Sequence, residues 1–215
     1  VVRDAFMEAL KAAGNDSGDG LAEVFVPDGT YYIDDWVGIY SNTWLHLSEK
    51  AKIIRMDGCH DKVMLSGIHT DSNGCVCYWN CKHYGYTQVE NIVISGGEWD
   101  GGIGEGTFTY PGGEDISNCL MSFRHAANIT ICDTKIGNSD ARHFISFDGV
   151  NGITIKRTEF HDQGLNQEYY GHNPEDWNGA EVVHTDFIFK EHQWSDAFPT
   201  DEDLACCNVW IEGCV

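Results

Sequence analysis

The stretch HFISFDGVNGITIKRTEF, residues 143–160, closely repeats CLMSFRHAANITICDTKI, residues 119–136, after a step of 24 residues. Each copy predicts two short strands, because apolar and polar side chains alternate on either side of a polar break. Related strands begin with NIVI at residue 91 and with NVWI at residue 208. A β-rich repeat of ~20–25 residues with connections of variable length is typical of stacked coils that bury their inner faces against one another.

The alternation gives each position of the repeat a direction. The inward side chains are expected to be the aliphatic pairs Ile129/Ile131, Ile153/Ile155 and Val209/Ile211. Asparagines that open these strands fall at one equivalent corner, where we expect them to bond to the backbone of the neighbouring coil: Asn91, Asn128 and Asn208. The alternative is a β-sandwich in which the Asn-Ile-Thr strands recur by coincidence.

The first segment predicts a capping helix over residues 1–14. In DAFMEALKAAG, Asp4 is the expected N-cap and Gly14 the expected end. The helical period places one set of small and apolar side chains on a common face: Ala5, Phe6, Ala9, Leu10 and Ala13. Short β runs follow in VFVPDGTYYI and WLHLSEKAKIIRM, broken by turn sequences.

The helix, VFVPDGTY, SNTWLHLSEKAKI and the NITI strands together resemble the right-handed parallel β-helix of the pectin-lyase-like superfamily. The resemblance covers nearly the whole chain and implies an all-β solenoid with a short N-terminal capping α-helix. Residues 1–215 would form a single parallel β-helix domain with loop insertions at 100–118 and 161–180. The chain does not begin with Met and NVWIEGCV ends inside an expected strand, so we expect a fragment whose C-terminal coils are missing.

The net charge of the chain limits the classes of molecule that it is expected to bind. Its 34 acidic and 13 basic residues give a net charge of −21, which repels the phosphates of nucleic acids and the heads of anionic lipids. A neutral carbohydrate fits this charge better than a polyanionic one. No apolar run is long enough to cross a bilayer, so the sequence predicts no membrane span.

Nine cysteines occur, an odd number, and most lie in apolar strand-like runs. This pattern predicts buried thiols rather than a disulfide scaffold. CVCYWNCKH, residues 75–83, offers an alternative metal-binding arrangement, although its spacing matches no standard zinc pattern. We therefore expect no cofactor and no metal.

Two carboxylates are the candidate catalytic residues. The strands LMSFRH, FISFDG and VVHTDF place Arg124, Asp148 and Asp186 at equivalent outward positions, which lie ~4.8 Å apart on adjacent coils. Two carboxyl groups this close are expected to share a proton near neutrality, as glycoside cleavage requires, while Arg124 keeps one of them ionised. The simpler alternative is that Asp148 only opens the Asp-Gly turn.

Further residues near these two carboxylates are candidate carbohydrate contacts, because aromatic rings stack on sugar faces and polar groups bond to hydroxyls. They are Asp140, Arg142 and His143 before Asp148, Tyr169, Tyr170 and Trp177 in the long insertion, and Glu181 and His184 before Asp186. AEVVHTDF, residues 180–187, resembles an E-A-I-Q-x-D strand of the lacto-N-biosidase family of gut bacteria, with His184 at the Gln position. Asp196, Asp201 and Asp203 are alternative partners for Asp186.

The sequence thus predicts a secreted or cell-surface bacterial glycoside hydrolase that cleaves an oligo- or polysaccharide with Asp148 and Asp186. The main alternative is a non-catalytic carbohydrate-binding adhesin or tailspike-like module. A polysaccharide lyase is less favoured, because no calcium cluster is evident, and a structural stalk has no use for long aromatic loops. The oligomeric state stays open, since further chain or a partner subunit would complete the stack.

Overall fold

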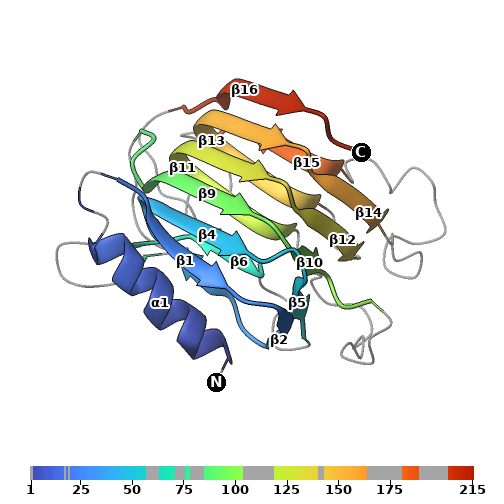
Figure 1. The fold of residues 1–215 in the computed structure, drawn as a ribbon. Helices are drawn as coiled ribbons and strands as arrows, with labels where there is room; N and C mark the ends of the chain where they lie inside the picture. Colours follow the sequence, from blue (N-terminus) through green and yellow to red (C-terminus); the bar gives the residue numbers. More distant parts are fainter. Residues whose placement is uncertain are drawn as a thin grey trace, which may run out of the picture.

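The computed structural model describes one helix and a series of short strands, most of which pair in parallel (Figure 1). The described residues are 2–16, 18, 20–56, 63–70, 76–77, 85–103, 119–139, 143–163, 181–188 and 203–215. Within them the strands form a nine-stranded sheet, a five-stranded sheet and an antiparallel pair, β7 (His69–Thr70) with β8 (Val76–Cys77).

The nine-stranded sheet stacks equivalent strands in parallel register. Its main path runs β1-β4-β9-β11-β13-β15, β16 also pairs with β13, and β6 pairs with both β3 and β11. The bounds are β1 Ala22–Val26, β3 Val37–Ile39, β4 Thr43–Leu47, β6 Leu65–Gly67, β9 Val89–Ser95, β11 Cys119–Cys132, β13 His143–Lys156, β15 Glu181–Asp186 and β16 Cys207–Glu212. Phe123 pairs with Phe147 and Ile129 with Ile153, so one repeat of 24 residues corresponds to one step between neighbouring strands.

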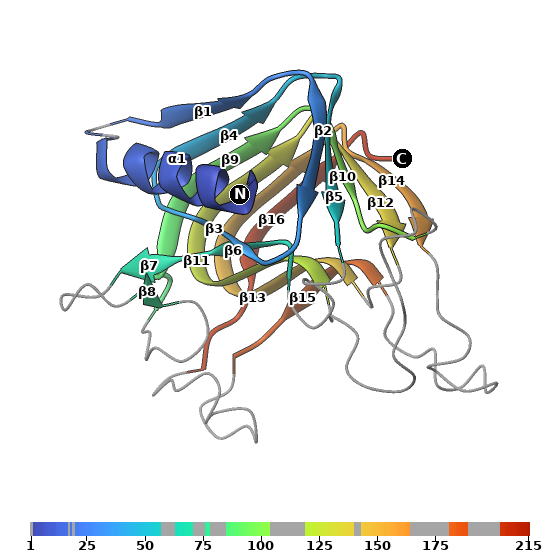
Figure 2. The same cartoon turned by 90° about the horizontal axis from the view of Figure 1, so that it is seen from below.

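The five-stranded sheet is also parallel and has the order β14-β12-β10-β5-β2. Its bounds are β2 Gly29–Ile33, β5 Ala51–Arg55, β10 Glu98–Asp100, β12 Lys135–Ser139 and β14 Glu159–Gln163. Figure 2 shows this sheet along one side of the core, while the long strands β11 and β13 curve around the other side. The helix α1 (Val2–Asp16) lies against the N-terminal strands.

The expected fold class is corrected by this arrangement. In place of an all-β right-handed solenoid, the described residues form two parallel sheets with a helix packed against them. The repeat explains why the strands stack in parallel, because ladder bonds join equivalent positions of neighbouring copies. It does not determine how the sheets are joined, because the step between copies varies from 24 residues (128 to 152) to 56 residues (152 to 208).

The core is a ladder of aliphatic and aromatic side chains from successive strands. The expected inward pairs Ile129/Ile131 and Ile153/Ile155 are fully buried. Val209 and Ile211 are instead 45% and 54% exposed, because β16 pairs with β13 alone among the described strands. Full burial of an isoleucine stabilises a fold by roughly 1.5–3 kcal/mol. The buried isoleucines of β11 and β13 therefore contribute more to the stability of the fold than the exposed side chains of β16.

Asparagines line one corner of the nine-stranded sheet. Asn91 donates to Oδ1 of Asn42 at 2.8 Å, and Asn128 donates to Oδ1 of Asn91 at 3.0 Å, so a side-chain ladder replaces the expected bonds to the backbone. These three residues have φ of 55° to 57°, a left-handed conformation that asparagine adopts more readily than most residues. Gly152 takes this corner in β13 with φ of 85°. Nδ2 of Asn208 donates to Oδ1 of Asn151 at 2.8 Å.

The ends of α1 differ from the expectation. The helix begins at Val2, so Asp4 lies in its first turn rather than at the N-cap. It also continues past Gly14 to Asp16. Gly14 serves a packing purpose instead of ending the helix, since a Cβ at this position would lie 2.4 Å from Cβ of Tyr40.

The buried face of α1 is narrower than predicted. It consists of Phe6, Leu10 and Ala13, whereas Ala5 and Ala9 are exposed, because the helix turns its bulky side chains toward the strands.

Among the residues that the structure describes, no helix is long and apolar enough to cross a lipid bilayer.

Five cysteines of the described residues are thiols rather than disulfides: Cys119, Cys132, Cys206, Cys207 and Cys214. Burial raises the pKa of the Cys119 thiol to about 12 and that of Cys132 to about 11. Residues 75 and 78–83 of the CVCYWNCKH motif lie outside the described part of the chain, so its metal-binding alternative stays a prediction.

Candidate functional site

The register of three neighbouring strands brings Arg124, Asp148 and Asp186 into one row. Arg124 of β11 pairs with Asp148 of β13, and Asp148 pairs with Asp186 of β15. This neighbourhood was predicted from the repeat and is confirmed. It arises because a parallel ladder places equivalent residues of successive strands side by side.

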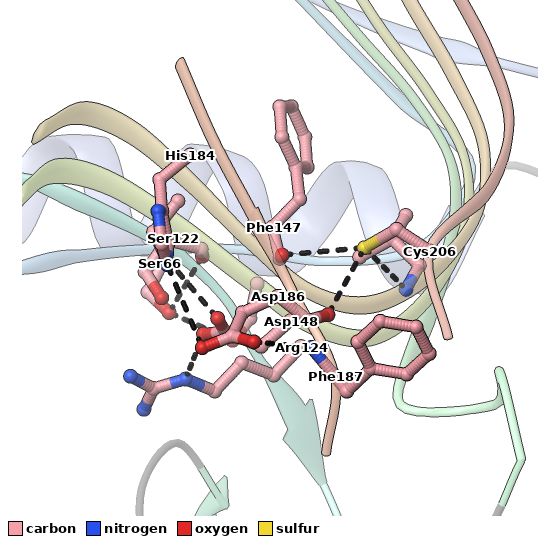
Figure 3. Close-up of polar contacts among 12 residues, drawn as sticks. Ser66, Ser122, Arg124, Phe147, Asp148, His184, Asp186, Phe187 and Cys206 are labelled. Atoms are coloured by element: carbon pink, nitrogen blue, oxygen red, sulfur yellow. Dashed lines mark hydrogen bonds and ion pairs between the residues drawn. The ribbon is translucent and has the colours of Figure 1, made fainter. Parts of the chain in front are cut away.

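Asp148 is held by two donors. Nε of Arg124 donates to its Oδ2 at 2.7 Å (Figure 3). Oγ of Ser146 donates to its Oδ1 at 3.3 Å. Only 18% of the Arg124 side chain and 17% of the Asp148 side chain are exposed. A charge-assisted bond in such a site fixes both side chains and is stronger than the same pair in open solvent.

Asp186 has a separate set of contacts. Its Oδ1 accepts the backbone N–H of Phe187 at 2.7 Å, and its Oδ2 lies 3.6 Å from Nε2 of His184. Sγ of Cys206 donates to the carbonyl oxygens of Phe147 at 3.2 Å and Asp186 at 3.4 Å, and thereby ties the end of β15 to β13 (Figure 3). Each carboxylate thus accepts from its own donors, as structural carboxylates do, and this undermines the expected acid and nucleophile pair.

A second group of residues gathers at the start of the same strands. His143 opens β13 and pairs with Glu181, which opens β15. Nδ1 of His143 lies 3.4 Å from Oε2 of Glu181, and Nδ1 of His184 contacts the same oxygen at 2.5 Å. The two imidazole rings stack at 4.2 Å between centroids with 15° between their planes. His143 is buried, whereas about half of the Glu181 side chain is exposed.

The structure therefore brings together six of the candidate residues, namely Arg124, His143, Asp148, Glu181, His184 and Asp186. Asp140, Arg142, Tyr169, Tyr170, Trp177, Asp196 and Asp201 lie outside the described residues, while Asp203 is exposed in the described part. Sequence reasoning gave no role to Ser146, although its outward direction beside Asp148 was a usable signal. No signal pointed to Cys206, because it reaches the row from a distant segment.

No protein-family model matches the chain. The chain is 29% identical over 221 residues to plasmin and fibronectin-binding protein A of Streptococcus pneumoniae, a match that covers 98% of this chain and 28% of that protein. The chain therefore spans less than a third of the length of this curated relative.

Solved structures show the same fold. Two structures of PfbA, a surface adhesin of Streptococcus pneumoniae, match with a TM-score of 0.70 at 22% and 21% identity, over 99% of this chain and 45% and 48% of theirs. A protein of Parabacteroides merdae, provisionally named a glycosyl hydrolase, matches with a TM-score of 0.58 at 10% identity, over 99% of this chain and 87% of that one. At these identities the likeness concerns the fold alone.

These findings correct several expectations. The membership in the pectin-lyase-like superfamily and the likeness to lacto-N-biosidases are not supported, because no family model matches and the chain matches two solved structures of PfbA. The expectation of a glycoside hydrolase acting on carbohydrate is likewise overturned, since the curated relative is named for binding two proteins. The adhesin alternative is better supported. The expected bacterial surface location is confirmed, because PfbA is a surface adhesin.

Proposed function

We propose that this chain is part of a bacterial surface adhesin that binds host extracellular proteins of the plasmin and fibronectin kind. The observation that carries this proposal is the 29% identity to plasmin and fibronectin-binding protein A over 98% of the chain. The match covers 28% of the relative, so the proposed role of this chain corresponds to one part of the binding surface of such an adhesin.

The contact surface that we propose is the row of Arg124, Asp148 and Asp186 together with Glu181. Asp186 and Glu181 are 54% and 48% exposed, while the ion pair of Arg124 and Asp148 on the neighbouring strands is held in place. Phe187, 54% exposed, lies next to Asp186 and supplies an apolar anchor. Side chains that rigid strands hold in position lose little entropy on binding, which favours affinity.

The other candidate residues lie in segments of the sequence that lead into the strands of the proposed contact surface. Residues 164–180 join β14 to β15, and they carry Tyr169, Tyr170 and Trp177. Residues 140–142 join β12 to β13 and carry Asp140 and Arg142. Aromatic and arginine side chains dominate the binding energy of protein interfaces, so these residues are proposed as partner contacts.

The charge of the chain indicates the character of the partner surface. A net charge of −21 attracts a basic patch and raises the rate of association, and salt screens this attraction. We therefore expect binding to weaken as ionic strength increases.

Binding of the chain to immobilised plasmin and to fibronectin, measured by surface plasmon resonance at low and high salt, tests the proposal. Asp186→Asn, Glu181→Gln and Phe187→Ala should each weaken binding by about 10-fold, or ~1.4 kcal/mol. Glu159→Gln, which removes one exposed charge from the five-stranded sheet, is the matched control and should bind as the unmodified chain does.

Two outcomes would contradict this function. If the unmodified chain binds neither protein, the adhesin proposal fails for this part of the protein. If it binds both and Glu159→Gln weakens binding as much as Asp186→Asn does, the contact surface lies elsewhere and only the net charge matters.

A further inference from the structure

Three metal-ligand side chains converge at the start of β13 and β15. His143, Glu181 and His184 each offer one donor atom, and the three donor atoms lie within 4.8 Å of one another. Both Nδ1 atoms lie within 3.4 Å of a single oxygen, Oε2 of Glu181. We propose that these three residues bind one Zn²⁺ ion that clamps β15 to β13.

The distances fit a tetrahedral ion. Zinc binds imidazole nitrogen and carboxylate oxygen at about 2.0–2.2 Å, which separates neighbouring ligand atoms by roughly 3.3 Å. Nδ1 of His143 and Oε2 of Glu181 already stand 3.4 Å apart. The contact of His184 with Glu181 must open by about 0.8 Å, and Glu181 can retreat because about half of its side chain faces solvent.

The donor set selects the metal. Two imidazoles and one carboxylate suit zinc, whereas Ca²⁺ and Mg²⁺ prefer an all-oxygen shell. Three protein ligands leave a fourth tetrahedral position, which solvent fills. The strongly acidic chain also favours a cation over an anion at this surface.

Neighbouring groups orient the ligands before an ion arrives. Nε2 of His184 faces Oδ2 of Asp186 at 3.6 Å, which leaves Nδ1 directed at the proposed ion, as in carboxylate–histidine–zinc arrangements. His143 is buried, with 7% of its side chain exposed, and its ring stacks on that of His184. Because the lone pair of an imidazole nitrogen lies in the ring plane, two stacked rings cannot both direct Nδ1 at one ion. The more exposed ring of His184 must therefore turn out of the stack when the ion binds.

The clamp has a structural consequence. Among the described strands, β15 pairs only with β13, through a register that begins at His143 and Glu181. An ion that binds the folded chain and not the unfolded chain stabilises the fold by mass action. We expect saturating Zn²⁺ to raise the melting temperature by about 5 °C or more.

Zn²⁺ titration of the reduced chain by calorimetry is the first test. His184→Ala and Glu181→Gln should each weaken binding at one site by about 10-fold or more and abolish the melting shift. His46→Ala is the matched control, because His46 contacts Glu23 at 2.6 Å on the same sheet and the described residues offer no third metal ligand there. This variant should bind zinc as the unmodified chain does. These three positions are partly exposed, so the variants are expected to fold, which circular dichroism checks.

Co²⁺ substitution separates this site from the cysteines. The proposed site gives the visible bands of a tetrahedral ion without a thiolate charge-transfer band, and alkylation of the cysteines leaves these bands in place. Thiolate bands that vanish on alkylation, or equal loss of zinc in His46→Ala and His184→Ala, would overturn the proposal. Zinc binding is measured without any protein partner, so its outcome is independent of the adhesin function.

Discussion

Arg124 and Asp148 occupy paired positions of β11 and β13, and Nε of the arginine donates to Oδ2 of the aspartate at 2.7 Å. Both side chains are mostly buried, so a charge that loses its partner there is poorly solvated. We expect Arg124→Gln and Asp148→Asn each to lower the free energy of unfolding by about 1–3 kcal/mol, as measured by urea denaturation.

The control for this pair lies on the exposed surface. Arg157 binds Asp133 through two bonds of 2.6 Å, but 61% and 50% of these side chains are exposed. Arg157→Gln should therefore change stability little. An equal loss in Arg157→Gln and Arg124→Gln would show that burial is not what strengthens the Arg124–Asp148 pair.

The asparagine corner predicts a difference between two substitutions at Asn128. Asn128→Ala removes a side-chain bond and places alanine, which adopts the left-handed conformation less readily than asparagine, at φ of 55°. Asn128→Gly removes the same bond but tolerates the conformation, as Gly152 does at the equivalent corner of β13. The alanine variant should be less stable than the glycine variant by about 1–2 kcal/mol. Equal stability in urea unfolding would mean that the backbone conformation contributes nothing at this corner.

The core ladder predicts a contrast between two isoleucines at paired positions. Ile155 of β13 is fully buried, whereas its partner Ile211 of β16 is 54% exposed. Ile155→Ala leaves a cavity and should lower the free energy of unfolding by about 2–5 kcal/mol. Ile211→Ala should cost less than about 1 kcal/mol in the 215-residue chain. The prediction fails if thermal denaturation shows the two variants to be equally destabilised.

Gly14 predicts a reversal of the usual helix propensity. Replacing a glycine inside a helix by alanine normally stabilises a protein by about 1 kcal/mol. Here the new Cβ would lie 2.4 Å from Cβ of Tyr40, so Gly14→Ala should push α1 away from the strands and lower the melting temperature. Asn15→Ala, at an exposed position of the same helix, should leave it nearly unchanged. A rise in melting temperature for Gly14→Ala would refute the close approach.

The burial of Cys119 predicts that its thiol is protected from alkylation in the folded protein. Burial raises its pKa to about 12, so at pH 8 roughly one molecule in ten thousand carries the thiolate that reacts with iodoacetamide. Peptide mass spectrometry should find Cys119 modified only after unfolding. Cys132, with a pKa of about 11, should react in the native protein as the pH is raised above 9. Labelling of native Cys119 at the rate of Cys132 would contradict its burial.

Much of the local geometry was accessible from the sequence. The pairing of Phe123 with Phe147 and of Arg124 with Asp148 followed from the 24-residue repeat, because ladder bonds align equivalent positions. The burial of the NITI isoleucines followed from alternation. The meeting of His143 with His184 did not, because it depends on side-chain directions at the strand ends, where alternation no longer fixes them.

The sequence by itself determined that equivalent strands stack in parallel and which side chains face the core, since both depend on a short repeat that each copy carries. Only the tertiary structure decided how two parallel sheets and a helix are arranged. It also decided that Asp148 is bound to Arg124 while Asp186 turns to His184 and its own backbone. These choices arise from contacts between segments far apart in the chain, whose separations the repeat does not specify.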